Sequence, residues 1–369
     1  MRKAFQFIGK TALTVIALTV VMVPAFAGPR PPVPTCTVNG IPSVTYSTDR
    51  GKTLAQVALP FTHVSYSFGV AALDAPGELI AEYDGTIYRS RDAGCSWQAV
   101  GGVEISPLQL TDAPGQRAYG WYDNGTYMVR ITPHGVFPLR LPGRAGNVVG
   151  VGVDRTDGSH VRIGDSNGAI FDSTDGGDTW AQSSRGPGLD PNRNIPYRVA
   201  FDPQNLDHIM VGTSVDGNYF TLDGGTRWDR PQIVGYHGEY NAFNMVISPV
   251  DSNVVWMNAI LLNYNGHTLR VMLRSTDGGL TYNYALRDSR TIFLQNGPVM
   301  AAHPTDTNVL YFTFGSPTFG YGSDIYRYDA RTGVTEKFRH PEYDYISAIE
   351  FSKQDPSVIY FGTAETSAF

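Results

Sequence analysis

Short apolar segments recur along the chain, each followed by a turn rich in Pro or Asp and then by a run of β-branched and aromatic residues. Phe201-Asp-Pro203 followed by Ile209 to Gly212 is one such unit. Ile247-Ser-Pro249 is the start of another. Apolar runs of this length between turn residues predict β-strands. Two further strands follow, so each unit predicts a four-stranded antiparallel sheet.

A polar motif separates the third and fourth strands and reads Ser/Thr-x-Asp-x-Gly-x-Ser/Thr-aromatic. It occurs, with departures at single positions, at residues 47–54, 90–97, 173–180, 221–228 and 275–282. Asp accepts hydrogen bonds within its own turn, Gly allows a positive φ, and the final aromatic residue can pack against a neighbouring unit. We therefore expect structural, non-catalytic roles for Asp49, Asp92, Asp175, Asp223 and Asp277.

The units repeat every 40–55 residues or so, a spacing typical of propeller blades. Six units are recognisable, at about 62–103, 105–143, 148–184, 197–233, 242–287 and 298–340. The stretches 345–369 and 37–59 supply two strands each and would complete a seventh blade. This clasp would remove exposed strand edges. The sequence predicts an all-β protein, a single seven-bladed β-propeller closed by its N- and C-terminal strands.

These motifs resemble the Asp-box, or bacterial neuraminidase repeat, family. That family includes sialidases, sortilin-type receptor propellers, some xyloglucanases and propellers like the photosystem II assembly factors. The resemblance covers nearly all of residues 28–369 and implies the fold, whereas one fold hosts many activities. In this family the Asp motif lies on one face of the ring. The resemblance implies that binding or catalysis uses the opposite face.

Residues 1–27 read as a secretory signal peptide, and residues 28–369 as the propeller domain. A positive start at Met1-Arg-Lys3 precedes an apolar segment from Thr11 to Val23 and an A-x-A site ending at Ala27. We expect a secreted or periplasmic protein without a membrane span after cleavage. Its two cysteines, Cys36 and Cys95, suit a disulfide in an exported protein, with two separate buried thiols as the alternative.

Charge and motif content exclude several classes of partner. The formal net charge is −6, and removal of Arg2, Lys3 and Lys10 with the signal peptide would leave about −9. An acidic chain without basic runs is unsuited to nucleic acid. Zinc-type spacings and a phosphate-binding loop are absent, and Asp165-Ser-Asn-Gly168 lacks the downstream Glu of a calcium loop. We expect a monomer with no cofactor and no metal.

Loops on the face opposite the Asp motif carry many aromatic and charged residues. Between blades they are residues 182–196, 230–241, 287–298 and 339–345, and within blades 258–267 and 315–323. Aromatic rings with scattered charges suit recognition of a sugar or a protein. The candidate ligand-binding residues are Tyr236, His237, Glu239, Tyr240, Tyr264, Arg287, Asp288, Arg290, Tyr321, Arg339, Glu342 and Tyr343.

The sequence has no recognisable catalytic signature. A sialidase needs a Tyr nucleophile, a carboxylic acid and an arginine triad, and the family's early Arg-Ile-Pro string has its nearest counterpart at Asn194-Ile-Pro196. An endo-glycanase needs two facing carboxylates. We expect a non-catalytic propeller that binds a protein or glycan, including a secreted peptidase that it modulates or inhibits. The alternatives are a sialidase-like glycoside hydrolase and an assembly or adhesion factor.

Overall fold

The computed structural model describes residues 44–57, 67–316 and 321–364. The chain divides into two compact units, Met1–Arg30 and Pro31–Phe369, and the described residues all belong to the second. The expected signal peptide and Cys36 lie outside the described residues. Both the leader and the Cys36–Cys95 disulfide therefore stay predictions.

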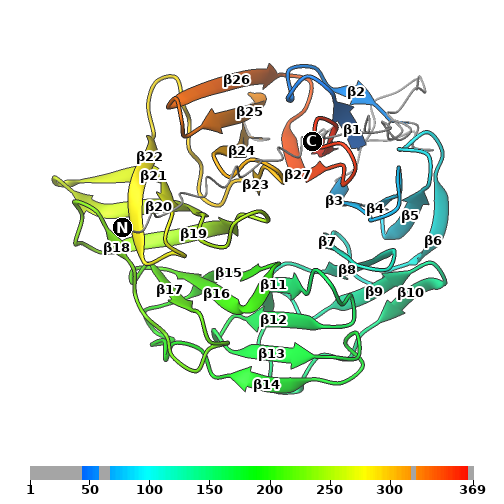
Figure 1. The fold of residues 1–369 in the computed structure, drawn as a ribbon, viewed down its shortest axis with the longest axis horizontal. Helices are drawn as coiled ribbons and strands as arrows, with labels where there is room; N and C mark the ends of the chain where they lie inside the picture. Colours follow the sequence, from blue (N-terminus) through cyan, green and yellow to red (C-terminus); the bar gives the residue numbers. More distant parts are fainter. Residues whose placement is uncertain (1–43, 58–66, 317–320, 365–369) are drawn as a thin grey trace, which may run out of the picture. The chain divides into compact units, whose positions relative to one another are not determined.

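Seven small sheets form a ring, as the repeat predicts (Figure 1). Within the described residues the chain forms strands and turns and no helix. The first three sheets after the N-terminal strands contain β3(Ser67–Ala72), β4(Leu79–Tyr83), β5(Thr86–Ser90), β6(Gln98–Gly102); β7(Gln109–Ala113), β8(Arg117–Trp121), β9(Met128–Thr132), β10(Gly135–Pro138); and β11(Val148–Val153), β12(Val161–Asp165), β13(Ile170–Ser173), β14(Ala181–Ser184).

The next three sheets follow the same chain order. They contain β15(Pro196–Asp202), β16(Asn205–Thr213), β17(Asn218–Thr221); β18(Gln232–Ile233), β19(Tyr240–Ile247), β20(Val255–Tyr264), β21(His267–Ser275), β22(Thr281–Arg287); and β23(Met300–Ala302), β24(Val309–Ser316), β25(Gly322–Asp329), β26(Val334–His340). The boundaries agree closely with the units expected from the sequence. Apolar runs between Gly, Pro and Asp turns thus locate these strands well.

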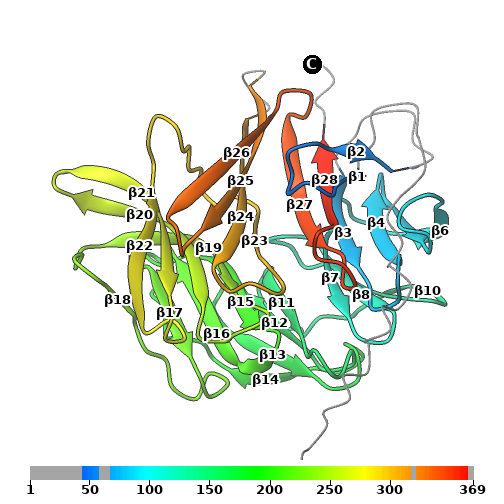
Figure 2. The same cartoon turned by 45° about the horizontal axis from the view of Figure 1, so that its top comes forward.

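The seventh sheet joins the two ends of the propeller. It contains β27(Tyr345–Phe351) and β28(Ile359–Ala364) from the C-terminal end, and β1(Val44–Ser47) and β2(Ala55–Gln56) from the N-terminal end. Figure 2 shows β1 beside β28, and their antiparallel register runs from Val44 opposite Gly362 to Ser47 opposite Ile359. The expected strand clasp is confirmed.

Two neighbouring blades depart from the four-stranded pattern. The sheet β15–β17 has three strands, and only an isolated bridge between Phe220 and Asp229 stands in place of a fourth. Pro231, two residues after Asp229, has no N–H to donate, which disfavours further pairing there. The chain then forms β18, which pairs in parallel with β22 and makes the next sheet five-stranded.

The Asp motif forms the turn between the third and fourth strands of its blade. In the third of these turns, the Ser173 hydroxyl donates to Asp175 at 2.8 Å and accepts from the N–H of Gly177 at 2.8 Å. The carboxylate of Asp175 also accepts from both the N–H and the hydroxyl of Thr179. Corresponding contacts tie Asp49, Asp92, Asp223 and Asp277 to their own turns.

The aromatic residue that ends the motif packs between blades. Tyr282 is fully buried in an apolar cluster with Met210 and Phe220 of the preceding sheet. Trp228 packs in the same way against a cluster that includes Ile170, again from the preceding sheet. Each turn motif therefore stabilises the interface with the blade before it.

Successive antiparallel strands place their turns alternately on two faces of the ring. The motif turns share one face with the turns between first and second strands. The turns between second and third strands, and the loops between blades, lie on the other, which we call the loop face. Among the described residues, no helix is long and apolar enough to span a membrane.

Candidate functional site

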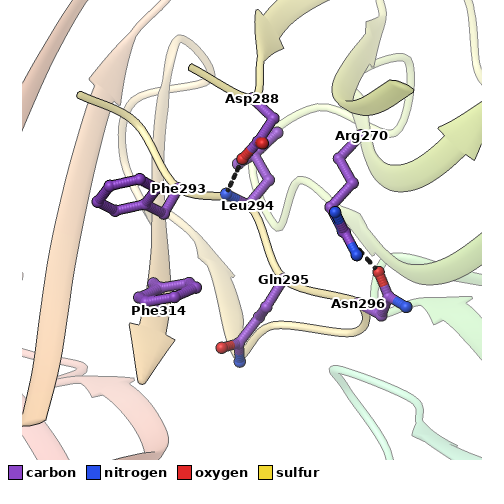
Figure 3. Close-up of a pocket in the computed structure, with 7 residues that line it drawn as sticks. All are labelled: Arg270, Asp288, Phe293, Leu294, Gln295, Asn296 and Phe314. Carbon is purple, nitrogen blue, oxygen red and sulfur yellow. Dashed lines mark hydrogen bonds between the residues drawn. The ribbon is translucent and has the colours of Figure 1, made fainter. Parts of the chain in front are cut away.

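A pocket of about 460 Å³ opens on the loop face between the sheet β18–β22 and the sheet β23–β26 (Figure 3). The loop 288–299 between β22 and β23 forms much of its wall. Phe314, near the end of β24, and Arg270, near the start of β21, complete it. The lining residues are Arg270, Asp288, Phe293, Leu294, Gln295, Asn296 and Phe314.

Hydrogen bonds hold the loop 288–299 in one conformation. The carboxylate of Asp288 accepts a hydrogen bond from the N–H of Leu294 at 2.8 Å. This contact joins the two ends of the first turn of the loop. The N–H of Phe293 donates to the Tyr326 hydroxyl at 3.1 Å. The N–H of Gly297 donates to the Asn258 side chain at 3.0 Å. A loop fixed this way needs little reordering on binding, which favours affinity.

One side of the pocket is polar. The guanidinium of Arg270 donates through Nε to the side-chain oxygen of Asn296 at 3.1 Å (Figure 3). The side-chain oxygen of Gln295 accepts from the N–H of Gly315 at 3.1 Å. These contacts cross from the loop to β21 and β24, so both neighbouring blades shape the pocket.

Two phenylalanine rings, Phe293 and Phe314, line the opposite side of the pocket, and the Tyr321 ring packs against both. The centroids of Phe293 and Phe314 are 5.4 Å apart, and Tyr321 meets both rings edge-on at 6.4 and 5.3 Å. Phe293 and Phe314 are half-buried, so each leaves part of a ring at the surface. The ammonium of Lys337 lies 4.9 Å from the Phe293 ring centroid. Such amphipathic aromatic surfaces are common at recognition sites.

A buried carboxylate anchors this aromatic edge. Asp324 is fully buried and accepts from the hydroxyls of Tyr321 at 2.8 Å and Tyr326 at 3.3 Å. Its charge is balanced by Lys337 at 2.9 Å and Arg339 at 3.4 Å. Burial alone would lower the pKa of Lys337, but the hydrogen bonds to Asp324 and Tyr321 and the charge of Asp324 together outweigh it and raise that pKa to about 12. Burial raises the pKa of Tyr326.

A second aromatic group lies on the neighbouring blade. The guanidinium of Arg287 lies over the rings of Tyr284 and Tyr264, at 4.4 and 5.3 Å from their centroids. The Tyr264 ring also meets Tyr236 at 6.3 Å. The segment 258–267, expected as a loop, is largely strand, because β20 and β21 continue to a tight turn at Asn265 and Gly266.

The other predicted binding residues do not gather at one point. Tyr240 and Tyr343 are buried in apolar clusters, so neither offers a ring face to a ligand. The Tyr240 hydroxyl donates a hydrogen bond to the side-chain oxygen of Asn218 at 3.0 Å. Tyr236 is also buried, and its hydroxyl donates to the backbone oxygen of Glu239 at 2.6 Å. Four exposed residues lie elsewhere on the loops: His237, Glu239, Arg290 and Glu342.

Local polar contacts occupy two of those exposed residues. Glu239 pairs with Arg193 of the preceding interblade loop. Glu342 lies 3.4 Å from the buried imidazole of His340. Of the predicted set, Asp288 lines the pocket, whereas Tyr321 and Arg339 contact the buried Asp324 next to its aromatic side.

Sequence reasoning missed Phe293, Phe314, Arg270, Asp324 and Lys337. Phe293 stands in a run of apolar residues within a polar loop, Ile292-Phe-Leu294, and that run is the one signal that could have indicated it. The other four lie within strands, where the alternation of side chains predicts core or surface but not which side chains of neighbouring blades meet; of these four, Arg270 and Phe314 line the pocket.

The arrangement offers aromatic surface, one guanidinium, amides and one carboxylate. Asp288 is the only acidic residue among the seven that line the pocket, whereas glycoside hydrolysis of the usual kind needs two carboxyl groups. Within the described part of the chain, no cluster of His, Cys, Asp and Glu could hold a metal ion. These groups suit binding by packing and hydrogen bonding.

Fold and pocket together define a seven-bladed β-propeller with a preformed pocket between two blades. The chain is 40% identical over 351 residues to the dispase autolysis-inducing protein of Streptomyces mobaraensis, an alignment that covers 90% of this chain and 89% of that protein. The chain belongs to the family of the dispase autolysis-inducing protein. No protein-family model matches the chain.

Solved structures are similar in fold alone. A GH74 xyloglucanase from Xanthomonas campestris superposes with a TM-score of 0.59 at 15% identity, over 87% of this chain and 52% of the enzyme. YCF48 from Cyanidioschyzon merolae superposes with a TM-score of 0.54 at 16% identity, over 83% of this chain and 97% of YCF48. A further YCF48 structure, bound to a D1 peptide, has a TM-score of 0.55 at 12% identity, over 84% of this chain and 97% of that one.

Proposed function

We propose that this chain is an exported, non-catalytic propeller of the Asp-box type that binds a peptidase through its loop face and promotes self-digestion of that peptidase. The observation that carries the proposal is the 40% identity to a dispase autolysis-inducing protein over nearly the full length of both chains. Modulation of a secreted peptidase fits a chain that begins with the features of a signal peptide.

The pocket supplies what a protein-binding surface needs. Protein interfaces draw most of their affinity from a few aromatic and Arg residues in well-packed surroundings. Phe293, Phe314 and Arg270 are residues of these types; hydrogen bonds hold Arg270 and Phe293, and ring contacts hold Phe314. The YCF48 structure with a D1 peptide gives an example of a peptide bound by a protein of this fold. A propeller need not contain catalytic groups to act this way.

Co-incubation with dispase tests the proposal. Purified chain without residues 1–27 is mixed with dispase, and the loss of intact dispase is followed over time. We expect faster loss than with dispase alone. Replacement of exposed Arg270 in the variant Arg270→Ala should weaken dispase binding about tenfold, the typical effect of losing one interface Arg worth about 1.4 kcal/mol.

Arg227→Ala is the matched control, because Arg227 is an exposed arginine in a motif turn on the opposite face. It should bind dispase as the unsubstituted chain does. Unchanged dispase lifetime with folded protein would reject the proposed function. Equal loss of affinity in both variants would reject the loop face as the contact surface.

A glycan is the second candidate ligand, because Phe293 and Phe314 expose ring surface beside the polar groups of Arg270 and Asp288. Xyloglucanases share the fold. Hydrolysis of a panel of fluorogenic glycosides, including a sialoside and a xyloglucan fragment, measures catalysis directly. Turnover that is lost in Asp288→Asn would replace the binding proposal with a glycoside hydrolase; binding without turnover would indicate a glycan-binding propeller.

A further inference from the structure

Within the described residues, each motif turn has a backbone oxygen that accepts a hydrogen bond from a side chain of the preceding blade. The donor and acceptor pairs are Tyr360–Ala93 at 3.5 Å, Arg130–Gly176 at 2.9 Å, Ser184–Gly225 at 2.8 Å, His208–Gly278 at 3.0 Å and His340–Gly51 at 2.8 Å. Tyrosine, arginine and serine keep their donor proton throughout the neutral pH range, whereas histidine gains or loses a proton there.

His208, on β16, has both ring nitrogens against groups that accept hydrogen bonds. Nδ1 lies 3.1 Å from a carboxylate oxygen of Asp202, and Nε2 lies 3.0 Å from the backbone oxygen of Gly278. Both side chains of the pair are buried. Because a backbone oxygen cannot donate, Nε2 must carry a proton, and the contact with Asp202 needs a second proton.

The second proton belongs to the ring and not to the carboxylate. Burial alone would raise the pKa of Asp202, but the hydrogen bonds from His208, Ser252 and Gln204 and the charge of the imidazole together outweigh it and lower that pKa. Asp202 is therefore ionised near neutral pH, so both nitrogens of His208 act as donors. Burial disfavours this charged ring, whereas the adjacent carboxylate favours it.

The other carboxylates near this ring are engaged elsewhere. Asp207, the neighbour of the histidine on β16, pairs with Arg162 at 2.7 Å. Asp277 of the motif turn and Asp251 of the turn between β19 and β20 each accept hydrogen bonds within their own turn. Among the described residues, Asp202 is thus the carboxylate that contacts the imidazole, and the charge of the pair depends on one proton.

We propose that this pair makes the contact between the sheet β15–β17 and the motif turn 275–282 of the next blade dependent on pH. The doubly protonated ring donates to both Asp202 and Gly278. When one proton is lost, the remaining proton stays on Nδ1, because the hydrogen bond to a carboxylate is the stronger of the two. The lone pair of Nε2 then faces the Gly278 oxygen, so the contact becomes repulsive and the turn loosens.

The contact is therefore complete below the pH range in which the ring titrates and is lost as the pH rises through that range. This behaviour is independent of the proposed peptidase function, because it concerns the packing of one blade against the next and not the loop face.

Nitrogen NMR of the imidazole side chains tests the protonation state directly. The signals of His208 are identified by their loss in His208→Gln. We expect protons on both ring nitrogens at about pH 5.5 and on Nδ1 alone at about pH 8.5, on either side of the ordinary histidine pKa of about 6.5. A singly protonated ring at the lower pH, or a proton on Nε2 at the higher pH, would overturn the proposal.

Amide hydrogen exchange measures the effect on the turn, expressed as protection factors that remove the intrinsic pH dependence of exchange. Between the same two pH values, protection in 275–282 should fall about tenfold, the effect of one lost hydrogen bond. The motif turn 173–180 is the control and should not change, because its donor, Arg130, stays charged at both pH values. Equal changes in the two turns, or no change in 275–282, would contradict the proposal.

The variant Asp202→Asn separates the pair from a general effect of pH. The asparagine amide keeps the shape of the carboxylate, donates to Nδ1 and still accepts from the Gln204 N–H, which bonds Asp202 at 2.8 Å. A neutral ring can then donate to Gly278 at any pH. We expect 275–282 to show the same protection at both pH values in this variant, and a loss as large as in the parent would overturn the proposal.

Discussion

At the scale of single residues, hydrogen bonds within each motif turn lower the pKa of its Asp side chain. The hydroxyl of Thr179, then its N–H and the hydroxyl of Ser173, lower the pKa of Asp175 to about 2 from an ordinary value of 3.8. For Asp277, burial alone would raise the pKa, but the hydrogen bonds from Thr281 and Ser275 lower it. Because the folded pKa is below the unfolded one, these carboxylates stabilise the fold above about pH 4.

That stabilisation is lost as the pH falls through the folded pKa values, so we expect the protein to lose stability between about pH 4 and pH 2. The variant Thr179→Val removes the hydroxyl that contributes most to the shift at Asp175. A carboxyl NMR titration should then show the pKa of Asp175 closer to 3.8. Thr226→Val is the control, because its hydroxyl donates to a backbone oxygen. The pKa of Asp175 should stay near 2 in this variant. A pKa change in the control and none in Thr179→Val would refute the role given to the Thr179 hydroxyl.

Residue identity predicted these turn roles well, because the hydrogen bonds are local. It did not predict which aromatic residues of the loops are buried. Tyr240 and Tyr343 lie in aromatic-rich segments, as Tyr321 does, yet they turn into the core. Sequence cannot separate a buried from an exposed ring in a loop, because the direction of the ring depends on the neighbouring blade.

At the scale of elements, each motif turn needs a backbone conformation that Gly adopts at little cost. Gly279 has φ of +92°, and a Cβ there would lie 2.3 Å from the Met210 methyl group. We expect Gly279→Ala to lower the free energy of unfolding by about 1–3 kcal/mol, from the strained backbone and the contact combined. Chemical denaturation measures this change.

Gly143→Ala is the control, because Gly143 lies in a surface loop and nothing is within 4 Å of a Cβ placed there. It should leave stability unchanged or slightly improved. Equal stability of the Gly279→Ala variant and the parent would contradict the role assigned to the motif turn.

Element boundaries followed from the sequence where strand and turn signals alternate. The exceptions occur where a segment after one blade pairs with the next blade or is held by contacts to it. Gln232 and Ile233 were expected to close their own blade, but they pair with β22 of the next, after Pro231 removes a backbone donor. The pocket loop 288–299 has no repeat pattern, so its conformation follows from contacts to Asn258 and Tyr326 on two blades.

At the scale of the whole molecule, the propeller is a rigid ring with two chemically different faces. Pairing of β1 with β28 closes it, so all seven blades are held in one circle. The repeat predicted this architecture because every blade packs against its two neighbours in the same way. The pocket could not be predicted, because it forms where two blades with different loops meet.

The loop face is the surface through which we propose that the chain contacts a peptidase. Amide hydrogen exchange of the chain, alone and with inhibited dispase at saturation, tests this contact most directly. We expect slower exchange in 288–299 and at the turn of Asn265 and Gly266, with unchanged exchange in the motif turns 173–180 and 221–228. Protection confined to the motif turns, or no protection anywhere, would contradict it.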